Sequence, residues 1–372
     1  MHSLVLSARE NERDAASERV SRSAFPESAK SLGLFRMFVP RSHGGLELDL
    51  PAALAVISAL ARIDGSVGWT AMIACGSALF SAWAQRGTYD RIYRNGPDVP
   101  VCGSSQPVGT AEPVVGGWRI NGRWPFASGC MHAEWIAGFC VVTANAHPVL
   151  DAKGRPRVRC VILPAQDWEI EDSWHVAGLK GTGSHHVVLK DALVSEASLF
   201  DLEGGGPCVP GQLYAAVLYL LPLFHAAFSV GMAEGTLDEL AALARTGHQQ
   251  YQAATPMQES EIFQFELGRI HADLRAAQAF LQVQVASHWK HVLAGTLNDE
   301  ALMMEGKQAA VWIACTSARI ADACFALAGA SAVYETSPLQ RRLRDLHVAG
   351  QHAAGQQRQY VGAGKLPLMR SA

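Results

Sequence analysis

The spacing of apolar residues changes twice along this chain of 372 residues. Helical repeats of three and four residues come first, then short apolar runs broken by glycine, proline and asparagine, and helical repeats return afterwards. A helix turns every 3.6 residues, whereas a strand alternates every two. The pattern therefore predicts an N-terminal α-helical domain over 1–100, a middle β domain over 101–208 and a C-terminal helical bundle over 209–372.

The first domain is predicted to contain at least three helices. Residues 10–25 form a charged amphipathic segment, and 51–63 form a long apolar helix. Pro51 opens that helix, since proline suits a first helical turn. Asp64-Gly65-Ser66 then interrupts the pattern, and the side chain of Asp64 or Ser66 can cap the next helix over 67–83.

The middle domain is predicted to be all-β, because β-branched residues increase and turn residues recur about every 8–12 positions. Gly116-Gly117 and Asn121-Gly122 are both predicted to be tight turns. Seven segments are predicted as strands: PVCGSS, EPVV, GWRI, RWPFAS, WIAGFCVVT, VRCVILP and HHVVLKDALV.

The predicted strand RWPFAS has an unusual end. It carries the bulky Trp124 and Phe126 and then narrows abruptly to Ala127, Ser128 and Gly129. A core strand would stay bulky and would not place a hydroxyl at its tip. Taken alone, Ser128 is typical of a structural turn serine.

The last domain begins after a glycine-rich linker over 204–211. The stretch Leu213–Ala233 is long and apolar enough for a membrane span, but Pro222 and His225 interrupt it, which favours a buried bundle helix. A second helix shows alternating steps of four and three, as a bundle seam does. Its seam residues are Phe263, Leu267, Ile270, Leu274, Ala277, Leu281 and Val285.

Composition narrows the function classes. Hydrophobic residues make up 49% and charged residues 17%, which is typical of a folded enzyme and not of a disordered chain. A net charge of −3 gives no electrostatic case for nucleic acid or an anionic membrane. The eight cysteines form no CxxC pair, so we expect free thiols in a reducing cytoplasm. The start of the chain turns charged too soon for a secretory signal.

Several local motifs favour structural interpretations. The stretch 178–188 contains Gly181-Thr182-Gly183, but His186 replaces the third glycine of a dinucleotide fingerprint, so a turn in the β domain is favoured. His288 and His291 share a helix face that we expect to be solvated. No HExxH, carboxylate-rich triad or GxSxG occurs, and no metal site is expected.

The stretch SPLQRRLRDLHVAGQHA, residues 337–353, concentrates charge on a predicted bundle helix. Arg341, Arg342, Arg344 and Asp345 are expected to form a structural ion-pair cluster at a helix or subunit contact. His352 follows where the segment becomes small and polar. Without further context, a capped or solvated histidine and a functional one both remain open there.

Taken together, five segments resemble the acyl-CoA dehydrogenase fold superfamily. The likeness is closer to its oxygenase branch, the two-component flavin-dependent monooxygenases, which include the 4-hydroxyphenylacetate hydroxylase oxygenase, the steroid phenol hydroxylase and dibenzothiophene monooxygenase. The segments are GLFRMFVPRSHGG, IDGSVGWTAM, GGWRINGRWPFASG, GLKGTGSHHVVLKDALV and SPLQRRLRDLHVAGQH. The resemblance implies a mostly α fold with a central β-barrel-like domain, a C-terminal four-helix bundle and a homotetramer.

The absence of an acidic residue at one position favours the oxygenase branch over the dehydrogenases. Dehydrogenases of this fold need a carboxylate base, which in many of them follows the Arg-Asp motif nine residues after the arginine. Ala353 stands at that position, and neither Leu346–Ala372 nor Leu213–Ala233 contains Asp or Glu. The resemblance places His352 where oxygenases carry an active-site histidine. It therefore disfavours acyl thioester dehydrogenation by the usual mechanism.

The resemblance also implies a cofactor, a reaction and site residues. Reduced flavin, FMNH₂ or FADH₂, would come from a separate NAD(P)H:flavin reductase and react with O₂ to a C4a-hydroperoxyflavin that oxygenates a small, aromatic or heteroaromatic substrate. His352 and Ser128 are the implied catalytic residues. The implied flavin-binding residues are Trp124, Phe126, Ser128, Ser331 and Arg245, and the implied substrate-lining residues are His132 and Trp174.

Two other functions stay open at this point. One is an atypical flavoenzyme of the acyl-CoA dehydrogenase type that acts on an acyl thioester with a different base. The other is a non-catalytic flavin-binding protein with the same fold. The sequence does not identify the substrate or distinguish FMN from FAD.

Overall fold

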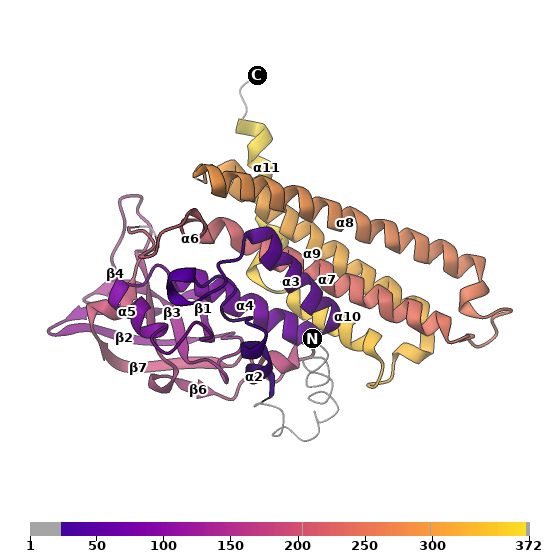
Figure 1. Ribbon diagram of the computed structural model, residues 1–372, viewed down its shortest axis with the longest axis horizontal. Coiled ribbons are helices and arrows are strands. Elements are labelled where there is room, and N and C mark those ends of the chain that lie inside the picture. The colour runs from indigo at the N-terminus through magenta and orange to yellow at the C-terminus, as the bar shows by residue number, and fades with distance from the viewer. Residues whose placement is uncertain (1–23, 203, 298, 370–372) are drawn as a thin grey trace. The chain divides into compact units, whose positions relative to one another are not determined.

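The computed structural model describes residues 24–202, 204–297 and 299–369 (Figure 1). Most of the charged segment predicted over 10–25 lies outside these residues. The chain divides into two compact units. The first contains the described residues up to Asp49, Ile73–His175 and Gly181–Val217, and the second contains Leu50–Met72, Val176–Lys180 and the residues from Leu218 onward. The three-domain division therefore stays a prediction.

The first unit contains the sheet. Its strands are β1 (Val101–Val114), β2 (Gly117–Trp124), β3 (Trp135–Ala144), β4 (His147–Pro148), β5 (Val158–Pro164), β6 (Glu169–Glu171), β7 (His186–Val194) and β8 (Leu199–Phe200). They are hydrogen-bonded in the order β6-β7-β2-β1-β3-β5-β8, with β4 paired to β3. Only β1 and β3 pair in parallel among the described strands. The short helices α2 (Ala24–Ser31), α5 (Arg86–Ile92) and α6 (Gln212–Ala215) belong to the same unit.

The predicted turn at Asn121-Gly122 is wrong. β2 continues through both residues, and its register against β7 shifts between Ile120 and Gly122, where β7 has one residue more than β2 and forms a bulge. At this bulge the side-chain oxygen of Asn121 accepts the backbone N–H of Asp191 at 2.7 Å. A hairpin turn is confirmed one position earlier than predicted, at Val115-Gly116, because Gly117 already pairs with Val114.

Two other strand boundaries differ from the prediction. PVCGSS and EPVV are parts of one strand, β1, with a register shift between Ser104 and Gly109. The predicted strand RWPFAS ends at Trp124. Phe126 has a φ of 64°, in the left-handed region that few side chains adopt, so the backbone leaves the sheet there. Ser128 therefore lies in a turn after the sheet.

Trp124 lies at the centre of the sheet's core. Its side chain is fully buried, its indole N–H donates to the carbonyl of Phe139 at 2.7 Å, and its ring meets Trp168 edge to face. Added Cβ atoms at Gly109, Gly122 and Gly138 would each collide with the indole. Glycine is therefore required at these three positions to make room for one large ring.

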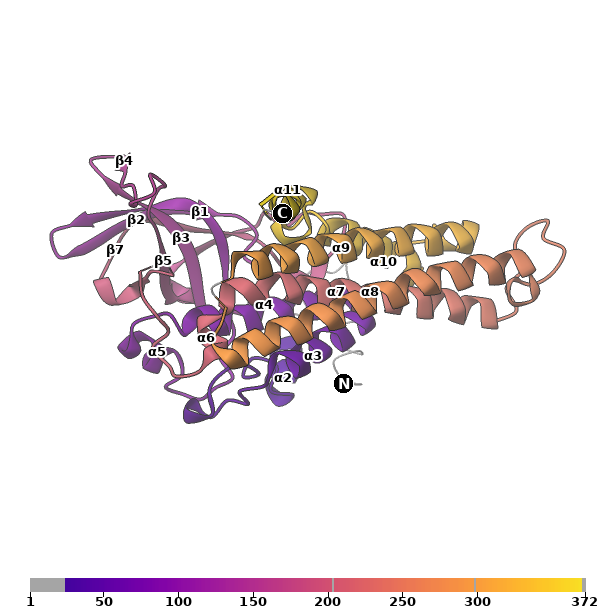
Figure 2. The same ribbon diagram turned by 90° about the horizontal axis from the view of Figure 1, so that it is seen from above.

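The second unit is helical. It contains α3 (Leu50–Ile63), the first half of α4 (Gly65–Ser81), α7 (Val217–Arg245), α8 (Glu261–Ala294), α9 (Glu300–Ala328), α10 (Pro338–Ala349) and α11 (Tyr360–Met369). Figures 1 and 2 show α7, α8 and α9 side by side as long helices. The predicted seam on α8 is confirmed: Phe263, Ile270 and Leu274 pack in one core with residues of α7 and α9.

Two described helices are long and apolar enough to cross a membrane by length and composition alone. Val217–Arg245 covers most of the stretch considered above, and 78% of its most apolar window is buried inside the protein. Glu300–Ala332 was not considered from sequence, and half of its window is buried. Extensive burial is what core helices of a bundle show, as was expected for the first of them.

Candidate functional site

The segment after β2 is held by the loop that precedes β7. The N–H of Ala127 donates to the carbonyl of His185 at 3.0 Å, and the N–H of Gly129 donates to the carbonyl of Thr182 at 2.8 Å. These backbone bonds run between two turns that are more than 50 positions apart in the chain. They fix the backbone on both sides of Ser128.

Ser128 belongs to a buried chain of three hydroxyl groups. Its Oγ lies 2.7 Å from Ser184 Oγ, which lies 2.7 Å from Thr182 Oγ1. All three residues are buried. Each hydroxyl can donate once and accept twice, so the chain can pass the donor role from one end to the other. Ser128 can therefore present a positioned hydroxyl to a ligand as donor or as acceptor.

Aromatic side chains flank this hydroxyl chain. Phe126 is 56% exposed, and the half-buried Trp174 meets it edge to face with ring centroids 6.2 Å apart. Nδ1 of the buried His185 lies 3.1 Å from the N–H of Ser173 and 3.3 Å from that of Trp174. Because only an unprotonated Nδ1 can accept these bonds, His185 carries its proton on Nε2. This imidazole helps to place Trp174.

Two other predicted residues of the first unit have different surroundings. The ring of Trp124 lies within the core of the sheet, so only its backbone can contact a flavin. His132 follows Ser128 in the same turn, where its N–H donates to the carbonyl of Gly129 and its side chain is half-buried. Substrate contact by His132 stays a prediction.

In the charge cluster of α10, structural ion pairs are confirmed for Arg341 with Asp64 at 3.9 Å and for Arg342 with Glu239 at 3.7 Å. Arg342 is 3% exposed and donates to the carbonyls of Arg62 and Ile63 at 2.8 and 3.1 Å. Those carbonyls belong to the end of α3, where a helix leaves them without partners. Asp64 caps the next helix by accepting the N–H of Val67 at 2.9 Å, which confirms it as one of the two predicted caps.

Asp345 is the buried acid of this cluster. Its Oδ1 accepts the backbone N–H of Leu179 at 2.5 Å. Burial raises the pKa of Asp345 to about 6, and the bond from Leu179 opposes that rise. An added Cβ at Gly178 would collide with the backbone of Arg344. The segment Val176–Lys180 is therefore closely packed on α10.

His352 lies in a cluster of aromatic rings beyond the end of α10. Its imidazole stacks on that of His225, with centroids 5.5 Å apart and planes at 14°. Trp69 meets the rings of His352, His225 and Phe228 edge to face at 5.4, 5.9 and 5.1 Å. The four rings come from α4, α7 and the segment after α10, all in the second unit.

The hydrogen bonding of His352 defines one of its nitrogens. Nδ1 accepts the N–H of Ala354 at 3.2 Å and caps a short 3₁₀ helix, Ala353–Gly355. Surrounding protein atoms lower the pKa of His352, and the neighbouring His225 lowers it further. The side chain keeps exposed surface, which limits the desolvation. A neutral imidazole is therefore favoured at neutral pH.

Ser331 and Arg245 complete the residues predicted for the second unit. Ser331 lies in the 3₁₀ helix Gly329–Ala332 between α9 and α10, and its hydroxyl donates to the carbonyl of Ala328 at 2.7 Å. Arg245 ends α7 as an exposed side chain. A role of either in flavin binding stays a prediction.

One histidine prediction is wrong. His288 is fully buried, not solvated: its Nδ1 bonds to the carbonyl of Gln284 at 2.8 Å, and Gly306 on α9 leaves room for its ring. A neighbouring helix covers that face, which local spacing does not reveal. Within the described parts of the chain, no group of three or more His, Cys, Asp and Glu side chains could hold a metal ion.

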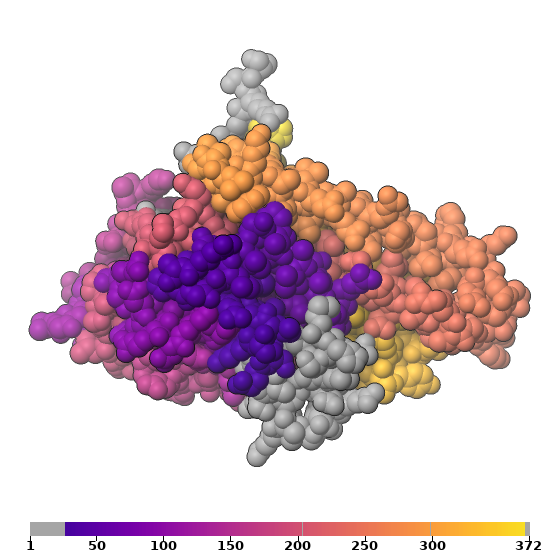
Figure 3. All heavy atoms as spheres, in the orientation of Figure 1, coloured from indigo at the N-terminus to yellow at the C-terminus, as the bar shows by residue number. Residues whose placement is uncertain are grey.

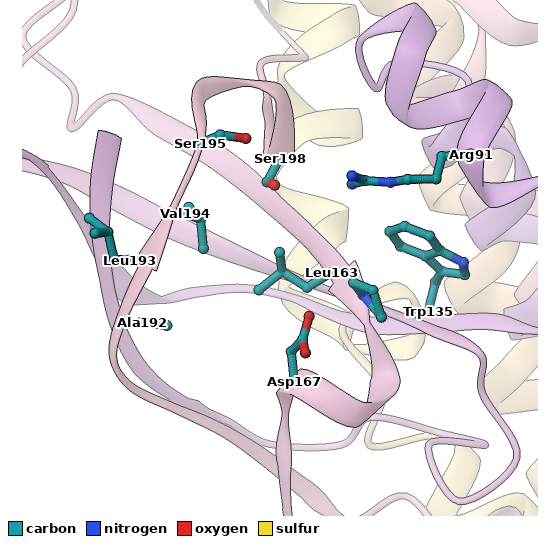
Figure 4. A pocket seen from close by; sticks show the side chains of 10 residues that line it. Arg91, Trp135, Leu163, Asp167, Ala192, Leu193, Val194, Ser195 and Ser198 are labelled. Atoms are coloured by element: carbon teal, nitrogen blue, oxygen red, sulfur yellow. The ribbon is translucent and has the colours of Figure 1, made fainter. Parts of the chain in front are cut away.

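A cavity of about 590 Å³ lies elsewhere in the first unit (Figure 4). Its lining includes Arg91, whose guanidinium lies over the ring of Trp135 at 5.3 Å, together with Leu163, Asp167 and Ser198. None of the predicted site residues lines this cavity.

Comparison with known proteins settles the family. Residues 5–90 and 223–357 match the N-terminal and C-terminal domains of acyl-CoA dehydrogenase. Indole-3-acetate monooxygenase of Pseudomonas putida is 32% identical over 91% of this chain and 85% of its own length. The flavin-dependent monooxygenase oxygenase subunit HsaA of Rhodococcus jostii is 30% identical over 92% of this chain and 91% of its own length. The chain belongs to the flavin-dependent monooxygenases of the acyl-CoA dehydrogenase fold.

Solved structures agree with the fold of this monooxygenase. The 3-HSA hydroxylase of Rhodococcus sp. RHA1 has a TM-score of 0.88 at 25% identity and covers all of this chain and 96% of its own. XiaF of Streptomyces sp., in complex with FADH₂ and glycerol, also has a TM-score of 0.88, at 23% identity, and covers 100% of this chain and 93% of its own. The predicted fold class and the use of reduced flavin with O₂ are confirmed.

The residues of the first unit fit a flavin. An isoalloxazine needs an apolar surface for its rings and hydrogen-bonding groups at its polar edge. Phe126 offers an aromatic surface beside Trp174, and the buried hydroxyl chain that contains Ser128 offers groups that can donate or accept. Of the site, the sequence missed Trp69, His225, Thr182 and Ser184.

Proposed function

We propose that this monooxygenase adds one oxygen atom from O₂ to a small aromatic or heteroaromatic substrate, with reduced flavin delivered by a separate NAD(P)H:flavin reductase. The observation that carries this proposal is the ring cluster of His352, Trp69, His225 and Phe228. This cluster places an imidazole among apolar rings, next to the position, Ala353, where many dehydrogenases of the fold carry a carboxylate. Relatives named for indole-3-acetate and resorcinol support an aromatic substrate.

Each candidate residue has a role in this proposal. When bound, reduced flavin supplies two electrons, so that one oxygen atom of O₂ enters the substrate and the other leaves as water. Ser128 gives a hydrogen bond to the polar edge of the flavin, Phe126 packs against its rings, and Trp174 lines the substrate side. His352 bonds to the reacting oxygen or to the substrate. The rings of Trp69, His225 and Phe228 give one side of His352 an apolar surface.

Self-association is part of the proposal, since α8 has an unusual outer face. In Figure 3 this helix, from salmon to orange, is open to view along much of its length. Exposed residues recur on it at steps of three and four, and most are apolar or small: Phe265, Gly268, Ala272, Ala276, Ala279, Val283, Ala286 and Leu293. We name these residues the α8 stripe. Small side chains allow two helices to approach closely, so a second copy of the chain is the proposed occupant, in a homotetramer.

A cytoplasmic location is also part of the proposal. All eight cysteines are free thiols, and six of them are buried. Free thiols of this kind persist in a reducing compartment.

The proposed flavin is FMNH₂ or FADH₂. Arg245 is the residue proposed to bind a phosphate group of this flavin.

Labelled oxygen tests the function directly. The purified protein is combined with NADH, a flavin reductase, FMN or FAD, ¹⁸O₂ and a panel of phenols, indoles and fused heteroaromatics. We expect one ¹⁸O atom in each product molecule and no NADH oxidation when the reductase is left out. Bleaching of bound oxidised flavin by an acyl-CoA without oxygen would instead favour the thioester function. Tight flavin binding with no reaction of either kind would indicate a non-catalytic protein.

A further inference from the structure

His225 lies behind His352 and is almost completely buried, with 1% of its surface exposed. Its Nε2 lies 3.0 Å from the carbonyl oxygen of Ala349. A carbonyl only accepts, so Nε2 carries the proton and donates. Nδ1 of His225 has no hydrogen-bond partner among the described residues, and burial lowers the pKa of this imidazole. His225 is therefore a neutral ring with one defined tautomer.

The ring of His225 touches both ends of the segment that carries His352. Ala349 is the last residue of α10, and its carbonyl is held by Nε2. At the other end, an added Cβ at Gly355 would lie 3.0 Å from Cε1 of His225. The backbone from Ala349 to Gly355 is thus held against this imidazole at two points.

The same segment determines which nitrogen of the His352 imidazole carries the proton. The N–H of Ala354 points at Nδ1, so this nitrogen must carry a lone pair. A neutral imidazole then has its proton on Nε2. Protonation of both nitrogens would break the cap and would place a charge against the stacked ring of His225.

We infer that His225 is a positioning residue that holds His352 in the neutral form with its proton on Nε2, so that His352 acts as a hydrogen-bond donor and not as a base. The catalytic consequence rests on the proposed function. A donor at Nε2 stabilises negative charge on an oxygen atom, whereas a base needs a lone pair there. The surroundings agree: the rings that contact His352 are those of Trp69 and His225, and no ion pair to His352 occurs among the described residues.

Three variants separate the hydrogen bond from the ring. His225→Gln keeps an N–H that can reach the carbonyl of Ala349 and removes the imidazole. His225→Phe keeps an aromatic ring and removes the donor. His288→Gln is the control, because His288 is equally buried and also bonds to a backbone carbonyl, but has no ring contact with His352.

The first measurement needs no flavin. Histidine ¹⁵N spectra of the full-length protein at pH 7 report which imidazole nitrogen carries the proton. We expect a pyrrole-type Nε2 and a pyridine-type Nδ1 for His352 in the wild type, in His225→Gln and in the control. In His225→Phe we expect averaged shifts, since the segment is no longer held. A charged His352 or a proton on Nδ1 in the wild type would overturn the inference and leave the proposed function untouched.

The second measurement is the ratio of H₂O₂ released to product formed in the reconstituted system. Loss of one hydrogen bond is worth roughly a fivefold change in this ratio. We expect that increase in His225→Phe, with recovery in His225→Gln and no change in the control. A ratio that stays the same in His225→Phe despite altered spectra would overturn the positioning role. Absence of any product in the wild type would count against the proposed function alone.

Discussion

The carboxylate of Asp345 accepts the backbone N–H of Leu179 across a separation of 166 positions. Leu179 has a φ of 53°, a conformation that few non-glycine residues adopt, so the contact holds a strained backbone. In sequence, each partner is followed closely by residues of the candidate site. Thr182 and Ser184, which bond in the hydroxyl chain of Ser128, follow Leu179, and His352 follows Asp345.

The stability contributed by Asp345 depends on pH. Its pKa rises from 3.8 to about 6 in the folded protein, so the folded state keeps a proton that the unfolded state loses above pH 4. As the pH rises from about 4 to about 6, ionisation therefore lowers the free energy of unfolding by up to roughly 3 kcal/mol. Asp345→Asn keeps an acceptor oxygen and does not titrate. Denaturant unfolding should show the variant gaining stability relative to wild type as the pH rises through this window, whereas a constant difference would contradict the assigned pKa.

Removal of the Ser128 hydroxyl should uncouple the reaction without unfolding the protein. In Ser128→Ala we expect roughly fivefold more H₂O₂ per product, since one hydrogen bond to the flavin is lost. Thermal unfolding should change little, because Ser184 keeps Thr182 as its partner. Ser198→Ala is the matched control, since Ser198 is a buried serine of the same unit that lines the cavity of Figure 4. Equal uncoupling in both variants would remove Ser128 from the site.

A methyl group at Gly109 should destabilise the sheet. The added Cβ collides with the indole of Trp124, which is fully buried and held by its bond to Phe139. Overpacking of this kind costs about 1–3 kcal/mol of unfolding free energy. Gly87→Ala is the control, because a Cβ there meets nothing within 4 Å. Urea titrations of the two variants should differ by at least the lower end of that range, and equal midpoints would show that the indole moves aside.

A charge in the α8 stripe should separate the subunits. Ala279→Arg places a cation among exposed small residues, and burying it against a second copy is unfavourable. Sedimentation velocity should show a smaller species than for the wild type. Ala152→Arg makes the same change at an exposed turn of the first unit and should leave the assembly intact. A wild-type protein that sediments as a monomer would contradict the proposed homotetramer.

Periodicity predicted the elements well where neighbours in sequence decide the structure. The helices Leu50–Ile63 and Gly65–Ser81 and the strand Val158–Pro164 were expected nearly to their ends. The Asn121-Gly122 signal failed because the side chain of Asn121 bonds to Asp191, a distant residue whose pairing converts a turn signal into a bulge.

The candidate site was only partly predictable. His352 and Ser128 are predicted only through the resemblance, since their local surroundings in sequence carry little information, and their roles stay predictions. Trp69 and His225 were missed because their ring contacts with His352 join segments up to 283 positions apart in sequence, and no spacing rule connects them. His225 was noted only as an interruption in an apolar run.

The three glycines around Trp124 leave a space that the indole fills, and removal of the indole would turn this space into a cavity. In Trp124→Gly the indole would vanish from a space bounded by the ring of Trp168 and by three glycines that have no side chains to collapse into it, Gly109, Gly122 and Gly138. Apolar cavities that cannot collapse stay dry and admit small aromatic molecules. The sheet of this variant would then become a receptor for free indole, whose binding would restore thermal stability in a dose-dependent way.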